Sequence, residues 1–216
     1  MTHLKRQSAP KTWPVPKKGT AYMVKPLSNL KTTIPLTLIL RDILRVCKNR
    51  REIKRAIQLR QIKVNSREVK DDKISLSLFD IMEIIPSKKH YQVGLSEKGK
   101  FEINETKEQD SKTKVAKIIN KKTLNGKKTQ INLGDGQNFL SEMKCRVNDS
   151  AVVNLKDRKI EKCLPLKENS RIIIFAGKHS GEKGTVKEIN SEKKIAVVEI
   201  NGVAVNAIIK QIMAIE

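Results

Sequence analysis

The segment that most constrains the fold runs from Leu36 to Arg67. Its first part carries apolar residues at spacings of three and four positions, which places them on one face of a helix that must be buried. These residues are Leu36, Ile39, Leu40, Ile43, Leu44 and Cys47. Pro35 stands at or near the first helical position, where its missing N–H costs nothing. The pattern predicts a short helix packed into a small core.

A second short helix is predicted to follow. Asn49 with Glu52 three residues later forms a capping-box pattern, which marks the start of a helix. Ile53, Ala56 and Ile57 then share the face expected to pack on the first helix.

The other faces of both helices are basic. The segment holds ten basic residues against two acids, Asp42 and Glu52. The basic residues are Arg41, Arg45, Lys48, Arg50, Arg51, Lys54, Arg55, Arg60, Lys63 and Arg67. Guanidinium forks suit a phosphate backbone, whereas the alternative, a merely solvated face, would tolerate interspersed acids. The segment is therefore a candidate nucleic-acid surface, and Asp42 is expected to pair within its helix with a nearby arginine, such as Arg45 at i+3.

The order of elements in this segment resembles the S-four RNA-binding domain. Two helices are followed by Ile62 to Val69 and then by Phe79 to Ile84, with a turn at Asn65 and Ser66 where the family usually has glycine second. The resemblance implies an RNA-binding module over residues 36–86.

The charge of the whole chain favours a polyanionic partner. Lys plus Arg is 45 and Asp plus Glu is 23, so the formal net charge is +22 over 216 residues. Aromatic residues are few, which leaves little material for stacking bases on a sheet. Recognition of the phosphate backbone and of shape is the better interpretation.

Several classes of site and location are not indicated. Cys47, Cys145 and Cys163 are far apart and odd in number, so they predict reduced core thiols rather than a disulfide framework or a metal site. No apolar run approaches the ~20 residues of a membrane span, and no signal peptide is visible. Neither a membrane partner, a cofactor nor a small-molecule substrate is expected.

Residues 1–35 predict an extended basic arm. They contain seven basic residues and no acid, and five prolines exclude a continuous helix. The basic residues proposed to meet nucleic acid here are Lys5, Arg6, Lys11, Lys17 and Lys18. We expect the arm to order only against a partner, and Trp13 to be a packing anchor rather than a base-stacking residue.

The middle of the chain, residues 87–169, predicts a small β-rich domain. Short strands are expected at 91–95, 101–103, 115–119, 129–133 and 151–155, with turns at 97–100, 124–127 and 134–136. Asp135 is expected to be a turn residue. The charged stretch 105–112 fits either a short helix or a loop.

The last segment, residues 170–216, predicts a small β-barrel of about five strands. Asn201-Gly202 separates two apolar strands, 195–200 and 203–208, which is a strong hairpin signal. Before them, Gly177, Gly181 and Gly184 punctuate a loop between strands and are interpreted as structural turn residues. This loop resembles a KOW motif with Gly184 as its hallmark glycine. Lys178, His179 and Lys183 are the loop residues that would touch nucleic acid.

An enzyme is not predicted. The three histidines, His3, His90 and His179, fall in an arm, a connector and a loop, and no acid and base are brought together by the pattern. Gly134-Asp135-Gly136 lacks the strand-to-helix context and the glycine spacing of a phosphate-binding loop.

Taken in order, the chain resembles the small-subunit ribosomal protein S-four-e family of archaea and eukaryotes, most closely its archaeal members. The arm opens with HLKRQSAPKTW and is followed by the S-four-like module, the β-rich middle and the KOW-like barrel. The resemblance implies an α+β chain of four parts that organises ribosomal RNA in the cytoplasmic ribosome beside neighbouring ribosomal proteins. The alternatives left open are a KOW-bearing transcription-associated protein and a chromatin-type DNA-binding protein.

Overall fold

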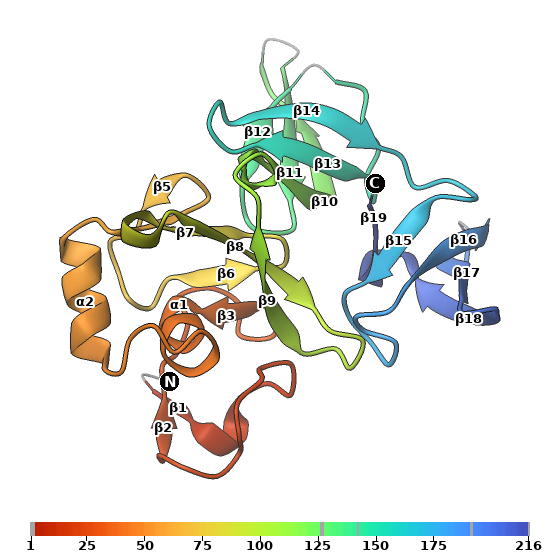
Figure 1. Ribbon diagram of the computed structural model, residues 1–216. Coiled ribbons are helices and arrows are strands. Elements are labelled where there is room, and N and C mark those ends of the chain that lie inside the picture. Colours follow the sequence, from red (N-terminus) through yellow and green to blue (C-terminus); the bar gives the residue numbers. More distant parts are fainter. Residues whose placement is uncertain (1–2, 126–127, 142, 191, 216) are drawn as a thin grey trace. The chain divides into compact units, whose positions relative to one another are not determined.

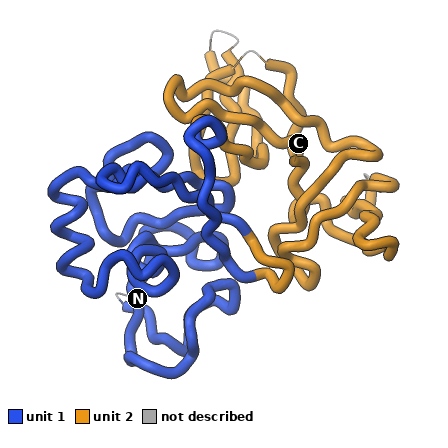
Figure 2. Tube along the Cα trace, viewed as in Figure 1, with its two compact units in different colours: residues 1–94, 100–111 blue, residues 95–99, 112–216 orange. Residues whose placement is uncertain are grey.

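The computed structural model describes residues 3–125, 128–141, 143–190 and 192–215. The chain is predominantly β, with little helix. Helices and strands are both present, as the α+β expectation requires, but the helices make up a small part of the chain. It divides into two compact units, coloured separately in Figure 2: residues 1–94 with 100–111, and residues 95–99 with 112–216. The strands form three five-stranded sheets and two strand pairs (Figure 1). Among the described residues, no helix has the length and hydropathy needed to cross a bilayer.

The first predicted helix is short and irregular. It begins as α1 (Leu36–Leu38) and continues as a π-helical turn, η2 (Ile39–Ile43). Leu36, Ile39 and Leu40 are buried as expected, whereas Ile43 is only half-buried. Leu38 is also buried, so this helical turn is surrounded by protein on several faces and not along a single apolar face.

The second helix, α2 (Arg50–Gln58), is capped at both ends, by side chains at its start and by backbone hydrogen bonds at its end. The predicted capping box is present, and the Glu52 carboxylate accepts hydrogen bonds from the backbone N–H of Lys48 at 2.7 Å and of Asn49 at 3.4 Å. At the other end Arg60 takes the left-handed conformation, φ 54°, and closes a Schellman motif with the next residue. Ile53 and Ile57 are buried on the inner face.

The N-terminal sheet has the order β5-β4-β7-β8-β9. Its strands are β4 (Ile62–Val64), β5 (Arg67–Glu68), β7 (Ile81–Ile84), β8 (Lys89–Leu95) and β9 (Phe101–Thr106). The predicted boundary after residue 86 falls inside this sheet, because β8 pairs with β7 across a turn that includes η3 (Ile85–Ser87). The charged stretch 105–112 contains one 3-10 turn, η4 (Asp110–Lys112).

The turn between β4 and β5 places Ser66 in a left-handed backbone conformation, φ 62°, directly after Asn65 at φ 51°. A residue with a Cβ pays about 1–2 kcal/mol there, more than the ~0.5–1 kcal/mol of extra chain entropy that glycine loses on folding. We therefore predict that Ser66→Gly raises the free energy of unfolding by about 0.5–1 kcal/mol, measured by urea denaturation. Ser66→Ala, which keeps the Cβ, should give no gain; equal effects of the two substitutions would contradict the explanation.

The N-terminal stretch is packed rather than simply extended. It forms β1 (Leu4–Lys5), η1 (Arg6–Ser8) and β2 (Tyr22–Met23), and β1 pairs with β2. Trp13 is 3% exposed, and its indole N–H donates to the backbone oxygen of Thr33 at 2.9 Å. Thr33 opens β3 (Thr33–Pro35), which pairs with β6 (Ser75–Ser77). Trp13 is the packing anchor that the sequence predicted, and the arm folds onto the module because this anchor has a core to enter.

The central sheet has the order β12-β11-β10-β13-β14. Its strands are β10 (Thr113–Thr123), β11 (Thr129–Leu133), β12 (Asn138–Leu140), β13 (Ser150–Asn154) and β14 (Lys159–Leu164), of which β12 and β14 were not predicted. The expected turn at 134–136 is present, and Asp135 accepts a hydrogen bond from the backbone N–H of Gln137 at 2.9 Å. The expected turn at 124–127 falls partly outside the described residues.

The prediction of three reduced thiols is wrong for two of them. Cys145 and Cys163 form a disulfide with their Cα atoms 6.0 Å apart, and Cys47 is free. Their spacing gives no pairing signature. The pair forms because the loop before β13 returns beside β14, which is adjacent to β13 in the sheet. Both cysteines pack in the core of the central sheet, with residues such as Ile118 and Ile131.

The C-terminal sheet has the order β18-β17-β16-β15-β19. Its strands are β15 (Arg171–Ile174), β16 (Lys183–Asn190), β17 (Ile195–Ile200), β18 (Val203–Ile208) and β19 (Ile212–Ala214), with η6 (Ile209–Gln211) before the last. The number of strands and the hairpin at Asn201 and Gly202 are as predicted, with φ values of 50° and 82° in the turn. Ile172, Val186 and Val198 are fully buried in its core.

A buried lysine joins the central and C-terminal sheets within the second unit. The side-chain nitrogen of Lys117, on β10, donates to the backbone oxygens of Ile212, at 2.5 Å, and of Ile209. Removal from water lowers the pKa of Lys117 to about 8, and the nearby charge of Asp149 opposes this shift only in part.

This pKa makes the stability of the second unit depend on pH. Between about pH 8 and pH 10 the folded state has released a proton that the unfolded state still holds, so the free energy of unfolding should rise with pH by up to about 3 kcal/mol. Below about pH 8 both states are protonated and the contribution is flat. The measurement is the difference in unfolding free energy between the wild type and Lys117→Met across this range, and a difference independent of pH would contradict the assignment.

Candidate nucleic-acid interface

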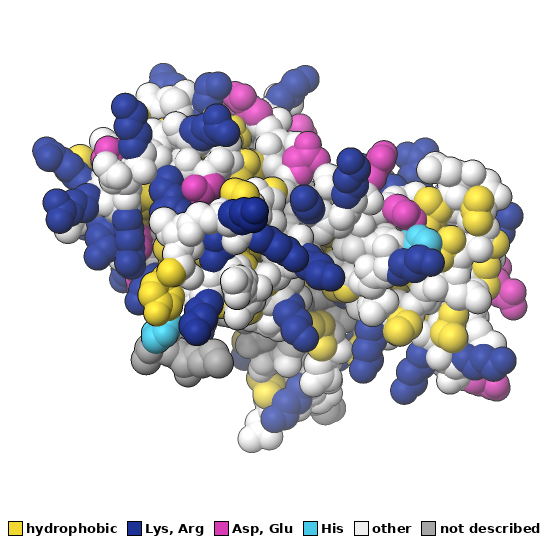
Figure 3. All heavy atoms as spheres, turned by 90° about the horizontal axis from the view of Figure 1, so that it is seen from below, with side chains coloured by type: hydrophobic (Ala, Val, Ile, Leu, Met, Phe, Trp, Pro, Cys, Tyr) yellow, Lys and Arg dark blue, Asp and Glu magenta, His cyan; other side chains and the backbone are white. Residues whose placement is uncertain are grey.

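The outer face of α2 presents three exposed basic side chains. Arg51, Lys54 and Arg55 lie at spacings of three and four positions on the side opposite the buried isoleucines, and all three are exposed. Within the described part of the chain, Arg51 and Arg55 make no ion pair. In Figure 3 basic side chains crowd the left edge, the side on which α2 lies in Figure 1. The face has the donors and the positive charge that bind a phosphate backbone.

Arg50, at the start of the same helix, is held internally. Its Nε donates to the carboxylate of Asp72, which is 5% exposed. Burial alone would raise the pKa of Asp72, but the hydrogen bond and charge of Arg50 outweigh burial and hold that pKa below its usual value. The same contact raises the pKa of Arg50. Arg50 therefore anchors the helix to the loop before β6, and its guanidinium is less free for a ligand than those of Arg51 and Arg55.

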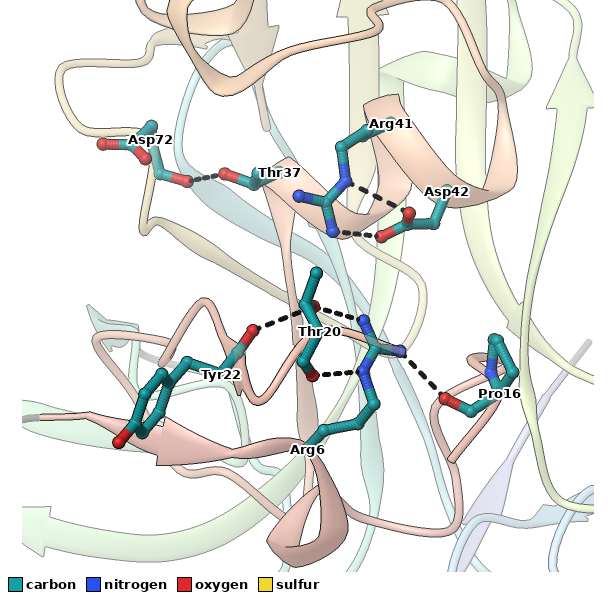
Figure 4. A network of polar contacts seen from close by, with 8 residues as sticks. All are labelled: Arg6, Pro16, Thr20, Tyr22, Thr37, Arg41, Asp42 and Asp72. Atoms are coloured by element: carbon teal, nitrogen blue, oxygen red, sulfur yellow. Dashed lines mark hydrogen bonds and ion pairs between the residues drawn. The ribbon is translucent and has the colours of Figure 1, made fainter. Parts of the chain in front are cut away.

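Asp42 pairs with a nearby arginine as predicted, but the partner is Arg41 rather than Arg45. The guanidinium of Arg41 donates twice to the neighbouring Asp42, at 2.8 and 3.1 Å, and this bond raises the pKa of Arg41 (Figure 4). The expected partner of Asp42, Arg45, has instead left the helix with φ 54°. The expected i, i+3 pair is absent because the helix ends before Arg45 completes its turn.

Arg6 organises the N-terminal stretch from within. Its guanidinium donates to the backbone oxygens of Thr20 at 2.8 Å and Pro16 at 2.9 Å, and to the hydroxyl of Thr20 at 2.7 Å (Figure 4). Three of its donors are thus used to close the loop between η1 and β2. The neighbouring lysines of this stretch point to solvent: Lys5, Lys11, Lys17 and Lys18.

The remaining basic residues predicted in the first unit are mostly exposed. Arg45, Lys48 and Arg67 are exposed, Lys63 is half-buried, and Arg60 lies 3.5 Å from Glu68 at a 75% exposed position. An exposed pair of this kind contributes little and is easily exchanged for a phosphate.

The glycine loop of the second unit is tightly packed. Gly177 and Gly181 have φ values of 100° and 96°, and a Cβ on Gly181 would collide with the backbone oxygen of Ser96. Gly184 has no such φ, but its Cα faces the backbone oxygen of Glu199 on β17 with no room for a side chain. These glycines set the loop by close backbone approach.

The polar side chains of this loop differ in availability. Lys178 and Lys183 are exposed, whereas Nδ1 of His179 lies 3.0 Å from the carboxylate of Glu182. Of the three loop residues predicted to bind, the two lysines are the better placed for a phosphate.

Sequence patterns missed the acids that decide which arginines remain free. Asp71 accepts the backbone N–H of Lys73 at 3.0 Å, as an aspartate in a turn does. Nothing local in the sequence marked its neighbour Asp72 as the buried partner of Arg50. Within the ranges that the structure covers, histidines, cysteines and acids form no cluster that would hold a metal ion.

Comparison with known proteins decides the family. Two family models match: the RS4NT (NUC023) domain over residues 2–28 and the ribosomal family S4e over residues 87–160. Small ribosomal subunit protein eS4 of Methanocella arvoryzae is 34% identical over 190 residues, covering 87% of this chain and 80% of that protein. The chain belongs to the ribosomal S4e family. A second archaeal member, from Methanothermobacter thermautotrophicus, is 33% identical over 204 residues and is covered to 84%.

A solved S4e structure shares the fold. The crystal structure of the 30S ribosomal protein S4e from Thermoplasma acidophilum matches with a TM-score of 0.73 at 23% identity, over 86% of this chain and 95% of that one. Most of the fold described above is therefore common to the two S4e proteins.

Proposed function

We propose that the chain is a structural, non-catalytic constituent of the small ribosomal subunit in the cytoplasm, which binds and organises ribosomal RNA. The observation that carries the proposal is the similarity across 87% of the chain to archaeal proteins named as small-subunit proteins. The net charge of +22 and the free basic face of α2 agree with a ribonucleoprotein partner.

In this proposal RNA is bound mainly by the first unit. Residues 36–86 act as an S-four-like RNA-binding module whose contacts centre on Arg51, Lys54 and Arg55, and the exposed lysines of residues 1–35 extend the contact. The fixed ends of α2 support this role, because a helix capped at both ends holds its cations in a set arrangement. Phosphate neutralisation lets the protein brace RNA segments that otherwise repel each other.

We assign residues 170–216 to a KOW-type small barrel. The five antiparallel strands, the short turn at Asn201 and Gly202, and the close approach of Gly184 to β17 support the assignment. Its charge is nearly balanced, with seven basic residues against five acids, so any contact with RNA rests on Lys178 and Lys183.

Sedimentation of a native lysate through a sucrose gradient at moderate salt tests the proposal. The chain should migrate with small ribosomal subunits and be released from them as salt rises, because six to ten phosphate contacts lose roughly 10³- to 10⁵-fold in affinity between about 50 and 200 mM salt. Migration with polymerase or chromatin would favour the transcription-associated or DNA-binding alternatives. Migration alone at the top of the gradient would overturn a ribosomal role.

A further inference from the structure

Strand β18 forms an open margin of the C-terminal sheet. Among the described residues it pairs only with β17, over residues 203–208, and it ends the strand order of that sheet (Figure 1). Val203 is 63% exposed and Ile208 is 47% exposed, at the two ends of the strand. Figure 3 shows hydrophobic side chains at the surface on this side of the molecule. An apolar, unpaired strand of this length invites pairing with another strand.

The other sheet margins within the described ranges are protected. β5, β12 and β19 are only two or three residues long, and β19 is buried. β9 carries two glutamates, and β14 carries two lysines and a glutamate. Short length and charge are the usual means by which proteins block pairing at a sheet edge. β18 has six residues with no charge and no proline, so it lacks both protections.

The register of β18 shows which backbone groups are available. The two-residue turn at Asn201 and Gly202 makes Ile200 and Val203 a hydrogen-bonded pair, and bonded pairs then alternate along the hairpin. Ala204 and Asn206 fall at the non-bonded positions, so their N–H and C=O groups point away from β17. Both residues are exposed. The edge therefore offers backbone donors and acceptors at every second residue, which is the spacing at which an extended peptide can pair with it.

The chemistry of this edge fits a protein strand better than RNA. Phosphate oxygens accept hydrogen bonds, so RNA would leave the outward carbonyls of β18 unpaired, whereas a peptide strand supplies both donors and acceptors. β18 itself carries no charged residue, and Glu199, opposite Ala204 on β17, is paired with Lys187 at 2.9 Å. The strand itself therefore offers a phosphate no cation, and the exposed Lys194 and Lys210 lie beyond its C-terminal end.

We propose that β18 is a docking edge on which an extended segment of a neighbouring ribosomal protein pairs as a sixth strand. The identity of the partner as a ribosomal protein rests on the proposed function, whereas the edge itself rests on the geometry of β18. Backbone pairing provides the affinity, and the exposed apolar ends at Val203 and Ile208 provide packing for the side chains of the partner.

Photo-crosslinking in the source cells tests the proposal. A benzophenone amino acid is placed at Ala204, and in a control protein at Thr185, which is exposed but lies on the interior strand β16. After illumination, products are separated on a sucrose gradient and identified by mass spectrometry. Position 204 should crosslink to one defined peptide of another protein, at least about fivefold above position 185. Crosslinks to RNA or to a second copy of this chain, or no excess over the control, would overturn the proposal.

A backbone variant then tests strand pairing itself. Asn206→Pro removes one outward N–H and should abolish the crosslink from position 204, while Asn206→Ser, which keeps that N–H, should retain it. If the proline variant does not fold, as judged by circular dichroism, Asn206→Lys replaces it and should give the same loss through edge charge. An undiminished crosslink in a folded proline or lysine variant would contradict pairing.

The same gradient separates the two proposals. A defined protein crosslink from position 204 that sediments away from small subunits would uphold the docking edge and overturn the ribosomal function. A chain that comigrates with small subunits without a protein crosslink from position 204 would do the reverse.

Discussion

Replacing Arg51, Lys54 and Arg55 together with alanine should weaken binding to small-subunit ribosomal RNA by about 10²- to 10³-fold and leave the fold intact. Each side chain is exposed on the outer face of α2, so its removal empties no core and breaks no internal ion pair of Arg51 or Arg55. A charge-assisted contact to phosphate contributes about 1–1.5 kcal/mol after the loss of water, which for three contacts gives this range. The slope of log affinity against log salt should also become shallower by about 2–3.

The measurement is RNA affinity at several salt concentrations, with circular dichroism to verify folding. The matched control removes three exposed cations from the turn after β13 and the start of β14, Lys156, Arg158 and Lys159, and so changes the net charge equally. An equal loss in both variants would show that net charge alone drives binding, and an unchanged affinity in the folded α2 variant would remove this helix from the interface. Arg50 is left out because its removal would strand the buried Asp72 and confound affinity with stability.

Gly184→Ala should lower the free energy of unfolding of the second unit by at least about 3 kcal/mol. The added methyl would collide with the backbone oxygen of Glu199, and would lie 2.9 Å from a methyl of Val198 and 3.0 Å from Ile200. A backbone atom in a central strand has no alternative position, so β16 and β17 must separate and their ladder must weaken.

The control for this variant is Gly202→Ala in the turn of the same sheet. Gly202 has φ 82° but no atom within 4 Å of the added methyl, so the substitution should cost only the backbone strain of about 1–2 kcal/mol. Urea denaturation of both variants checks the comparison. A cost at Gly184 no greater than that at Gly202 would contradict close packing as the reason for glycine at this position.

The elements that were predicted well are those in which neighbouring residues determine the backbone. The capping box at Asn49 and Glu52 correctly marked the start of α2. The Asn201-Gly202 dipeptide, whose residues readily adopt positive φ, correctly marked the turn of the last hairpin and the strands on either side of it. Such signals involve only two to four neighbouring residues, so they can be recognised without knowledge of the tertiary structure.

The predicted boundary after residue 86 falls inside the N-terminal sheet because it was based on local composition alone. A proline and two lysines in the stretch 86–89 have the composition of a connector, yet β8 continues the N-terminal sheet because β7 presents an unpaired edge to it. Strand pairing depends on the neighbouring strand, which local composition does not describe. The missed strands β12 and β14 have the same explanation.

By itself the sequence determined the class of partner and the positions of the basic helix, the glycine loop and the final hairpin. Charge is additive along a chain, and caps and turns are local, so both can be read from residues in order. The tertiary structure alone decided which cations remain free. Asp72 comes from 22 residues away to hold Arg50, Lys117 is buried against Ile212, and Cys145 meets Cys163. All three pairings depend on distances in space. For Asp72 and Lys117, burial makes an unpaired charge costly, so a partner is found wherever the fold places one. The disulfide forms because the loop that carries Cys145 returns beside β14.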